Sequence, residues 1–231
     1  MLKLFIANKN YSSWSMRPWV LMTQAGIAFQ EELIGFDSFE ADSDFKRKVL
    51  AVNPAGKVPV LLDTGHQPDL VVWDTLAITE YLAERFPEKR LWPAYATLRA
   101  RARSICAEMH AGFNALRGNC PMNIEAELPD AGALIWRDKA AVRADVARLV
   151  RMWSELLDAH GGPMLFKDFS VADAYFAPVC MRFKTYALPL PQNIADSVQR
   201  VCELPGVAAW MEGARAEQDF IPFEEPYRLK R

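Results

Sequence analysis

The sequence has few of the residues that build a metal site or a disulfide framework. It contains four cysteines and three histidines in 231 residues, and no two cysteines have the CxxC spacing of metal-binding or redox pairs. A chain of this length can bury a sufficient core without covalent cross-links. We therefore predict four reduced cysteines in a cytosolic protein, and no metal site.

Long apolar runs and an excess of charge of one sign are also lacking. No segment has about 18 consecutive apolar residues, and the apolar stretch at the N-terminus is broken too early for a signal peptide. With 27 basic and 29 acidic side chains, the formal net charge is −2. The composition predicts a cytoplasmic protein that binds neither a membrane nor a nucleic-acid backbone.

The first 86 residues alternate between strand and helix patterns. Short apolar runs predict strands at 2–7, 28–34, 58–62 and 70–73. Helical spacing predicts helices at 15–25, 42–50 and 74–86. Pro18 is expected in the first turn of the first helix, where a missing N–H costs nothing, and Gly26 is expected to end that helix. The order βαβ, then α, then ββα predicts a small mixed sheet with helices on both faces.

The rest of the chain shows almost only helical spacing. Residues 87–94 form a proline-containing linker, and a helical domain is expected over 95–231. Apolar spacing predicts helices at 98–116, 142–156, 170–183, 192–202 and 206–216, with an irregular connection at 119–135. Ser170 and Asp173 have the spacing of a capping box at a helix start, which is a structural role. The predicted fold class is an α/β domain followed by an all-α domain.

Three features of the first domain could hold a small anionic ligand, and the first is a group of hydroxyls. Ser12, Ser13 and Ser15 lie between the first strand and the first helix. Such hydroxyls either cap the helix or, with its N-terminal N–H groups, face a ligand sulfur or oxyanion.

The second and third features lie at a strand start and at a helix start. A cis bond before Pro59 would turn the N–H and C=O of Val58 toward a peptide-like ligand; the alternative is a trans proline at a sheet edge. Asp74 and Thr75 either cap the following helix or recognise an amino-acid head group, with Asp74 on the ammonium and Thr75 on the carboxylate.

Taken in this order, the segments resemble the soluble glutathione transferase family. The resemblance covers nearly the whole chain and is carried by NYSSWSMRPW, NPAGKVPVL, DTLAITEYL, RLWP and FSVADAYFAP. It implies a thioredoxin-like first domain, glutathione as co-substrate, a small electrophile as second substrate, and a homodimer. It also implies that Val58, before Pro59, pairs with the cysteinyl backbone, that Asp74 and Thr75 hold the γ-glutamyl end, and that Lys57 approaches the glycyl carboxylate.

The loop SSWSMR looks like the SSCSWR loop of zeta-type transferases. This likeness implies that the Ser12 hydroxyl activates the thiol, with Ser13 beside it. Tyr11 is the second candidate, because tyrosine-type members use a tyrosine near the end of the first strand. The loop has no cysteine, which argues against disulfide exchange.

The electrophile is expected between the two domains, against the first long helix of the second. Met109, His110, Phe113 and Arg117 fall on that predicted helix within two turns. Met109 and Phe113 are equally typical of a core, and Arg117 could bind an acidic substrate or the helix C-terminus. Three functions stay open: conjugation of glutathione, glutathione-dependent cis–trans isomerisation as in maleylacetoacetate isomerase, and a non-catalytic glutathione-binding module.

Overall fold

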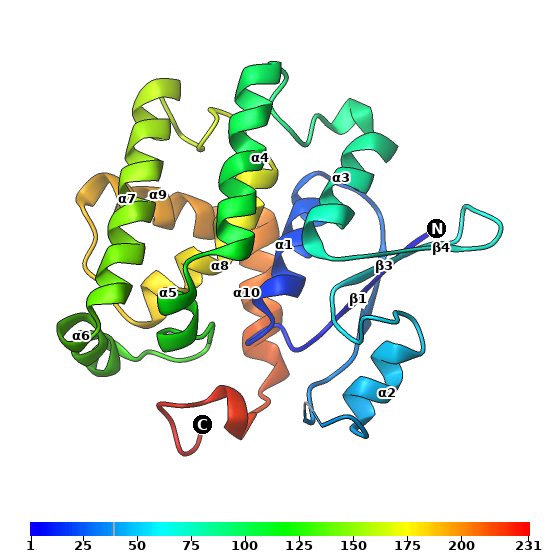
Figure 1. The fold of residues 1–231 in the computed structure, drawn as a ribbon, viewed down its shortest axis with the longest axis horizontal. Coiled ribbons are helices and arrows are strands. Elements are labelled where there is room, and N and C mark those ends of the chain that lie inside the picture. The colour runs from blue at the N-terminus through cyan, green and yellow to red at the C-terminus, as the bar shows by residue number, and fades with distance from the viewer. Residues whose placement is uncertain (39) are drawn as a thin grey trace.

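A computed structural model describes residues 1–38 and 40–231 (Figure 1). The strands are β1 (Leu2–Ile6), β2 (Gln30–Leu33), β3 (Val60–Asp63) and β4 (Leu70–Trp73). The helices among and after the strands are α1 (Ser13–Gln24), α2 (Asp44–Leu50), α3 (Thr75–Arg85) and the 3-10 turn η1 (Pro87–Lys89). The later helices are α4 (Ala96–Ala111), α5 (Asn114–Asn119), α6 (Pro129–Asp138), α7 (Ala140–His160), α8 (Val171–Thr185), α9 (Gln192–Glu203), α10 (Pro205–Glu217) and η2 (Pro222–Glu224).

The sheet has the mixed topology that the sequence predicts. Its strand order is β2-β1-β3-β4, with β1 parallel to β2 and antiparallel pairs elsewhere. Successive residues of a strand point to opposite faces. Leu4 of β1 accordingly belongs to the main core under α1 and α3, whereas Phe5 packs with Phe45 and Val49 of α2. Helices therefore cover both faces, as expected.

Helix α1 begins two residues earlier than predicted. The N–H of Met16 bonds to the carbonyl of Ser12 at 3.1 Å, which makes Ser13 the first helical residue. Pro18 thus lies inside the helix rather than in its first turn, and it removes the N–H that the Trp14 carbonyl would otherwise accept. The prediction was wrong because closely spaced serines offer several equivalent start points. Gly26 ends the helix at φ +62°, as predicted.

The long helix predicted over 98–116 is two helices. Helix α4 ends at Ala111, and Phe113 adopts a left-handed conformation with φ 55° before α5 begins. Apolar spacing did not reveal the break, because Leu116 of α5 packs into the same core as Met109 of α4. The break turns α5 away from the axis of α4 (Figure 1).

The prediction of an irregular connection over 119–135 is wrong for its last part, where α6 begins at Pro129. The buried residues of α6 are Gly132 and Ile135, too few to give a clear period. A Cβ at Gly132 would lie 1.8 Å from the Tyr186 carbonyl oxygen, so glycine is required where these two segments meet.

Helix α8 forms the centre of the helical part and packs against α1 and α4. Its start has the predicted capping box: Ser170 Oγ accepts the N–H of Ala172 at 3.3 Å, and Asp173 Oδ2 accepts the N–H of Ser170 at 2.9 Å. One hydrophobic cluster extends from β1 through α8 to α10. The sheet and the helices therefore share one core, which fixes the walls between them.

All four cysteines are buried free thiols. Within the described residues, every helix is too short or too polar to cross a lipid bilayer.

Candidate functional site

The loop between β1 and α1 brings two serine hydroxyls together inside the protein. The Oγ atoms of Ser12 and Ser15 lie 2.7 Å apart, and Ser15 Oγ accepts the N–H of Ala7 at 3.2 Å. Ser12 occupies the N-cap position of α1, yet among the described residues its side chain makes no capping hydrogen bond. The capping alternative is therefore wrong for Ser12, whose hydroxyl bonds to a second hydroxyl instead.

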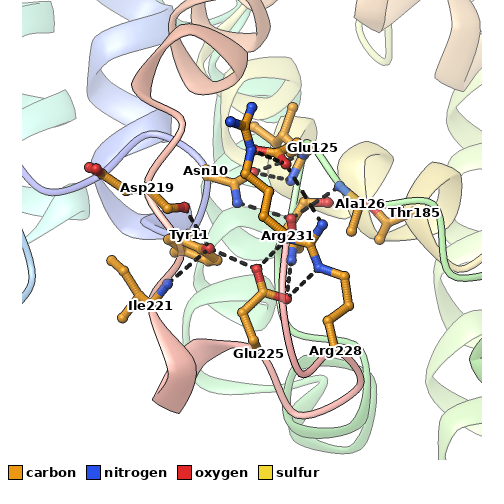
Figure 2. Close-up of polar contacts among 12 residues, drawn as sticks. Asn10, Tyr11, Glu125, Ala126, Thr185, Asp219, Ile221, Glu225, Arg228 and Arg231 are labelled. Atoms are coloured by element: carbon orange, nitrogen blue, oxygen red, sulfur yellow. Dashed lines mark hydrogen bonds and ion pairs between the residues drawn. The ribbon is translucent and has the colours of Figure 1, made fainter.

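Tyr11 is engaged with the C-terminal segment (Figure 2). Its hydroxyl oxygen lies 2.7 Å from Glu225 Oε1 and 3.1 Å from the Asp219 carbonyl oxygen, and it accepts the N–H of Ile221. Burial, followed by the hydrogen bond to Glu225, raises the pKa of Tyr11 to about 12. The single hydroxyl hydrogen of Tyr11 is thus already used, and the residue anchors the tail.

Glu225 is the centre of the polar network in Figure 2. Its Oε2 accepts from Asn123 Nδ2 and from Arg228 Nε, both at 2.8 Å. Burial opposes ionisation, but the hydrogen bond from Arg228 helps to hold the pKa of Glu225 below its ordinary value. Asn10 joins the network through Asn123 at 2.9 Å. The tail is therefore fixed against the hydroxyl loop, which brings Glu224 to the cavity beside it.

The peptide bond between Val58 and Pro59 is cis, so the alternative of a trans proline at a sheet edge is wrong. Strand β3 begins only at Val60, so Val58 stands outside the ladder. Within the described residues, no hydrogen bond reaches the Val58 backbone, while its side chain packs under α2. The N–H and C=O of Val58 therefore remain available to a ligand.

Asp74 joins β4 to α3 in a strained conformation. Its φ is 74°, which residues other than glycine rarely adopt. Its Oδ1 accepts the N–H of Leu76 at 2.8 Å, so it does cap α3. Strain of this kind costs about 1–3 kcal/mol and is concentrated at ligand sites. The Asp74 side chain is 46% exposed, so its carboxylate still reaches solvent.

A chain of hydrogen bonds ties Asp74 and Thr75 to the helical part. Asp74 Oδ2 lies 3.3 Å from Nε2 of His110, on α4. Nδ1 of His110 lies 2.9 Å from the hydroxyl oxygen of Tyr175, on α8. That hydroxyl is in turn 2.5 Å from Thr75 Oγ1. The two consecutive residues at the start of α3 are thus linked through two other helices.

The protonation state of His110 determines which group donates in each of these hydrogen bonds. Burial, together with the positive charges of Arg17 and Arg117, lowers the pKa of His110 although Asp74 opposes the shift. A neutral imidazole that donates from Nε2 to Asp74 accepts at Nδ1, so Tyr175 donates to it and Thr75 donates to Tyr175. The Thr75 hydroxyl is therefore used inside the protein, which corrects its expected role toward a carboxylate. Its N–H, at the start of α3, is the group left for a ligand.

This lowered pKa predicts a stability change in acid. As the pH falls through about 6.5, the unfolded chain binds a proton at this residue before the folded protein does, so the free energy of unfolding decreases. We expect H110N to lose less unfolding free energy than the parent between about pH 7 and pH 5, measured by urea denaturation. An equal loss in both proteins would contradict the assignment.

Trp14 contacts two guanidinium groups. Its ring centroid lies 4.2 Å from Arg17 Cζ and 4.8 Å from Arg117 Cζ. Arg17 also lies 4.4 Å from the ring of Tyr175, and its Nε and Nη1 have no hydrogen-bond partner within residues 1–38 and 40–231. Burial lowers the pKa of Arg17 to about 10, which leaves it charged at neutral pH. Cation–π contacts thus take the place of hydrogen bonds around this buried cation.

Two adjoining cavities lie between the sheet and the helices. The first, here called the Asp74 cavity, has a volume of about 460 Å³ and is lined by residues that include Trp14, Lys57, Val58, Pro59, Asp74, Thr75 and His110. The second, the Ser12 cavity, has a volume of about 560 Å³ and is lined by residues that include Tyr11, Ser12, Ser13, Trp14, Lys57, Val58, Arg117, Arg182 and Glu224. The two share Trp14, Lys57 and Val58.

The residues expected around the electrophile are divided among three places. Arg117 lines the Ser12 cavity and also donates to the carbonyls of His110 and Gly112, near the C-terminus of α4. His110 lines the Asp74 cavity. Met109 and Phe113 are 1% and 6% exposed and belong to the hydrophobic core, so their expected place in the pocket is wrong. The break after Ala111 removed the regular face on which that prediction depended.

Sequence reasoning missed several residues in or beside the two cavities, Trp14 and Lys46 among them. Tyr175, Arg182 and Arg17 lie on almost entirely buried helices, and Glu224 lies in the C-terminal turn. The two arginines interrupt apolar helix sequences, which is a usable signal of a buried charge. Glu224 has no such signal, because only the folded tail brings it to the cavity.

The chain is similar to known proteins over most of its length. Residues 11–85 match the model of the glutathione S-transferase N-terminal domain, and residues 136–213 match that of the C-terminal domain. The chain is 27% identical over 206 residues to Glutathione S-transferase GstB of Escherichia coli K12, covering 86% of this chain and 93% of that protein. It is 24% identical over 165 residues to a Stringent starvation protein A homolog of Histophilus somni, covering 71% and 68%.

A crystal structure of a glutathione transferase homologue from Burkholderia, with bound glutathione, has the same fold. It matches with a TM-score of 0.69 at 22% identity, over 93% of this chain and 98% of that chain. The expected fold class, a thioredoxin-like sheet domain followed by a helical domain, is confirmed.

Proposed function

Because the chain belongs to the glutathione S-transferase family, we propose that it is a glutathione transferase that holds glutathione in the Asp74 cavity and ionises its thiol at Ser12. The observation that carries the proposal is the junction of the two cavities at Val58. A tripeptide paired with the Val58 backbone has its γ-glutamyl end at Asp74 and its cysteinyl side chain toward Ser12.

Each end of the tripeptide has a matching group in this arrangement. The ammonium of the γ-glutamyl group lies against the exposed side of the Asp74 carboxylate, and its carboxylate meets the Thr75 N–H at the start of α3. Lys57, which lines both cavities, is the cation for the glycyl carboxylate. The free N–H and C=O of Val58 pair with the cysteinyl backbone.

Activation of the thiol requires only that its anion be stabilised. A free thiol has a pKa of about 8.5, and a decrease of two pKa units corresponds to about 2.7 kcal/mol. One charge-assisted hydrogen bond contributes about 1.5–3 kcal/mol, which is enough. In the structure Ser12 donates to Ser15. The bound thiolate takes this Ser12 hydrogen instead, and Ser15 then donates to Ser12, so that the N–H of Ala7, the two hydroxyls and the thiolate form one chain. Ser12 acts as a donor and forms no covalent bond.

A second candidate is a glutathione-binding module without turnover, because the similar proteins include a Stringent starvation protein A homolog, whose name states no transferase activity. Calorimetric titration with glutathione, followed by turnover assays on aryl halides, epoxides and activated alkenes, separates the two candidates. We expect binding together with turnover. Binding without turnover on the whole panel would support the module, and no binding would contradict both.

Replacement of Asp74 by asparagine should weaken glutathione binding about tenfold, because a charge-assisted hydrogen bond to the ammonium becomes a neutral one. Asparagine keeps an oxygen for the Leu76 N–H and tolerates the positive φ, so α3 stays capped. The dissociation constant is measured by calorimetry. D158N, an exposed charge change on α7, is the matched control. An unchanged dissociation constant in D74N would remove Asp74 from the site.

We extend the proposal to a cytoplasmic homodimer, in keeping with the family assignment. Edge strand β4 leaves Trp73 43% exposed, and Tyr95, before α4, is 75% exposed. Light scattering should give about twice the mass of one chain. A mass of one chain at micromolar concentration would contradict the dimer.

A further inference from the structure

The Ser12 cavity carries an excess of positive charge. Its wall includes four cations, Lys46, Lys57, Arg117 and Arg182, against one carboxylate, that of Glu224. Among the described residues, none of these cations has a carboxylate oxygen within 4.0 Å. The cavity is therefore a positively charged compartment that the protein itself does not neutralise by contact.

Arg182 is the most deeply buried of these cations. It is 5% exposed, and its Nη1 donates to the Cys120 carbonyl at 2.5 Å. Its Nε has no hydrogen-bond partner in the part of the chain that the structure describes. Burial, with Arg17 and Arg117 nearby, lowers the pKa of Arg182 to about 10, so it is still charged at neutral pH. A carbonyl oxygen satisfies one N–H but does not cancel the charge.

Two arginines nearer the surface of the same protein are paired with carboxylates. Arg103 is 2.7 Å from Glu80 and Arg148 is 2.7 Å from Glu108, both as two-pronged pairs. Solvent screens such pairs, so they contribute little. The arrangement is reversed at the cavity, where a buried cation without a counter-ion is costly. An incoming anion that pairs with these guanidinium groups removes that cost.

We propose that the electrophile accepted by the Ser12 cavity is an anion that carries a carboxylate, which Arg117 and Arg182 bind while the glutathione sulfur attacks the electrophilic carbon. This inference rests on the proposed function and specifies its substrate class. The planar, forked donors of guanidinium match the two oxygens of a carboxylate. Arg117 is half-buried, whereas Arg182 is enclosed, so the substrate enters past Arg117 and is held between the two.

The reaction with an aryl halide is balanced without any further reagent. The thiol proton passes to solvent when glutathione binds, and the thiolate sulfur then forms a bond to the ring carbon. The bond from that carbon to the halogen breaks, and halide leaves with the electron pair. No oxidant or reductant takes part.

A pair of matched substrates tests the inference: a chlorodinitrobenzoate, with chlorine para to the carboxylate, and its methyl ester. Each kcat/KM is divided by the uncatalysed rate constant with glutathione at the same pH, so that intrinsic reactivity cancels. We expect the acid-to-ester ratio of these normalised values to be about ten in the parent, equivalent to about 1.4 kcal/mol. R117Q should bring the ratio close to one.

A substitution of Glu224 should change the acid-to-ester ratio in the opposite direction. It lies in the same cavity near Arg182, and burial raises its pKa. Replacing it with glutamine removes the competing negative charge, so E224Q should increase the acid-to-ester ratio. R151Q, an exposed charge change on α7, should leave the ratio unchanged. E224Q also keeps the test valid should R117Q prove unstable through loss of its bonds to the end of α4.

The outcomes separate this inference from the proposed function. A parent protein that conjugates the ester but does not favour the acid overturns the anion preference and leaves the transferase function intact. If R117Q raises the thiol pKa of bound glutathione while the acid-to-ester ratio stays the same, the arginines serve the thiolate and the inference fails. A protein that conjugates neither compound contradicts the proposed function. In that case, calorimetric binding of the two glutathione conjugates, acid and ester, still decides the preference, and equal affinities overturn it.

Discussion

Replacement of Ser12 by alanine should lower kcat about 25-fold at pH 7, because loss of about 2.7 kcal/mol of thiolate stabilisation raises the bound thiol pKa from about 6.5 to about 8.5 and reduces the ionised fraction from about three quarters to about 3%. The dissociation constant of glutathione at pH 7 should rise only about fourfold, which is the part that ionisation of the bound thiol contributes to affinity, since the tripeptide still binds through its backbone and its charged ends. Titration of the thiolate absorbance in the binary complex measures the pKa directly. An S12A complex with the thiol pKa of the parent would contradict the role of Ser12.

The other two hydroxyls of the loop provide the comparison. Tyr11 already bonds to Glu225, so Y11F should leave the thiol pKa unchanged and instead loosen the C-terminal segment. Ser13 is half-buried at the same cavity wall, and it is Ser12, not Ser13, that bonds to Ser15. S13A should therefore affect turnover less than S12A does. If S13A shows the larger loss, Ser13 is the activating residue.

Replacement of Asp173 by alanine should lower the free energy of unfolding by about 2–6 kcal/mol, because it leaves two buried N–H groups without a partner and each costs about 1–3 kcal/mol. The carboxylate accepts the N–H of Leu165 at 3.0 Å and that of Ser170 at 2.9 Å, and it is 2% exposed. Total stability is about 5–15 kcal/mol for a domain, so the variant should unfold far more readily.

Urea denaturation followed by circular dichroism measures this loss. D168A removes an exposed carboxylate five residues earlier and is the matched control, with an expected change within about 0.5 kcal/mol. D173N should recover part of the loss, because its one side-chain oxygen replaces one of the two acceptors. A denaturation midpoint of D173A equal to that of the parent would contradict the structural role of the box.

The order and type of most elements could be predicted because apolar residues repeat with the period of the element that buries them. The first cavity could also be predicted, since Val58, Asp74 and Thr75 lie in short segments whose local geometry presents a ligand site. The break at Gly112 could not, because the apolar spacing continues through it. Helix α6 could not be predicted either, because its buried face contains a glycine where a large apolar residue would reveal the helical period.

The set of charges in the second cavity could not be predicted, for a different reason. Its two arginines come from α5 and α8, and its carboxylate comes from η2, so they are far apart along the chain. No local pattern relates Arg117, Arg182 and Glu224. Only the packing of α8 at the centre and the return of the tail to the loop after β1 bring them to one wall.

The bond between Tyr11 and Glu225 joins residues that are 214 positions apart. A ribosome therefore completes the sheet and most helices long before it supplies the partner that braces the hydroxyl loop. The 2.7 Å hydrogen bond from Asn8 to Asp219 likewise cannot form until Asp219 has been synthesised. The nascent polypeptide thus has an unfinished cavity until Glu225 has been translated.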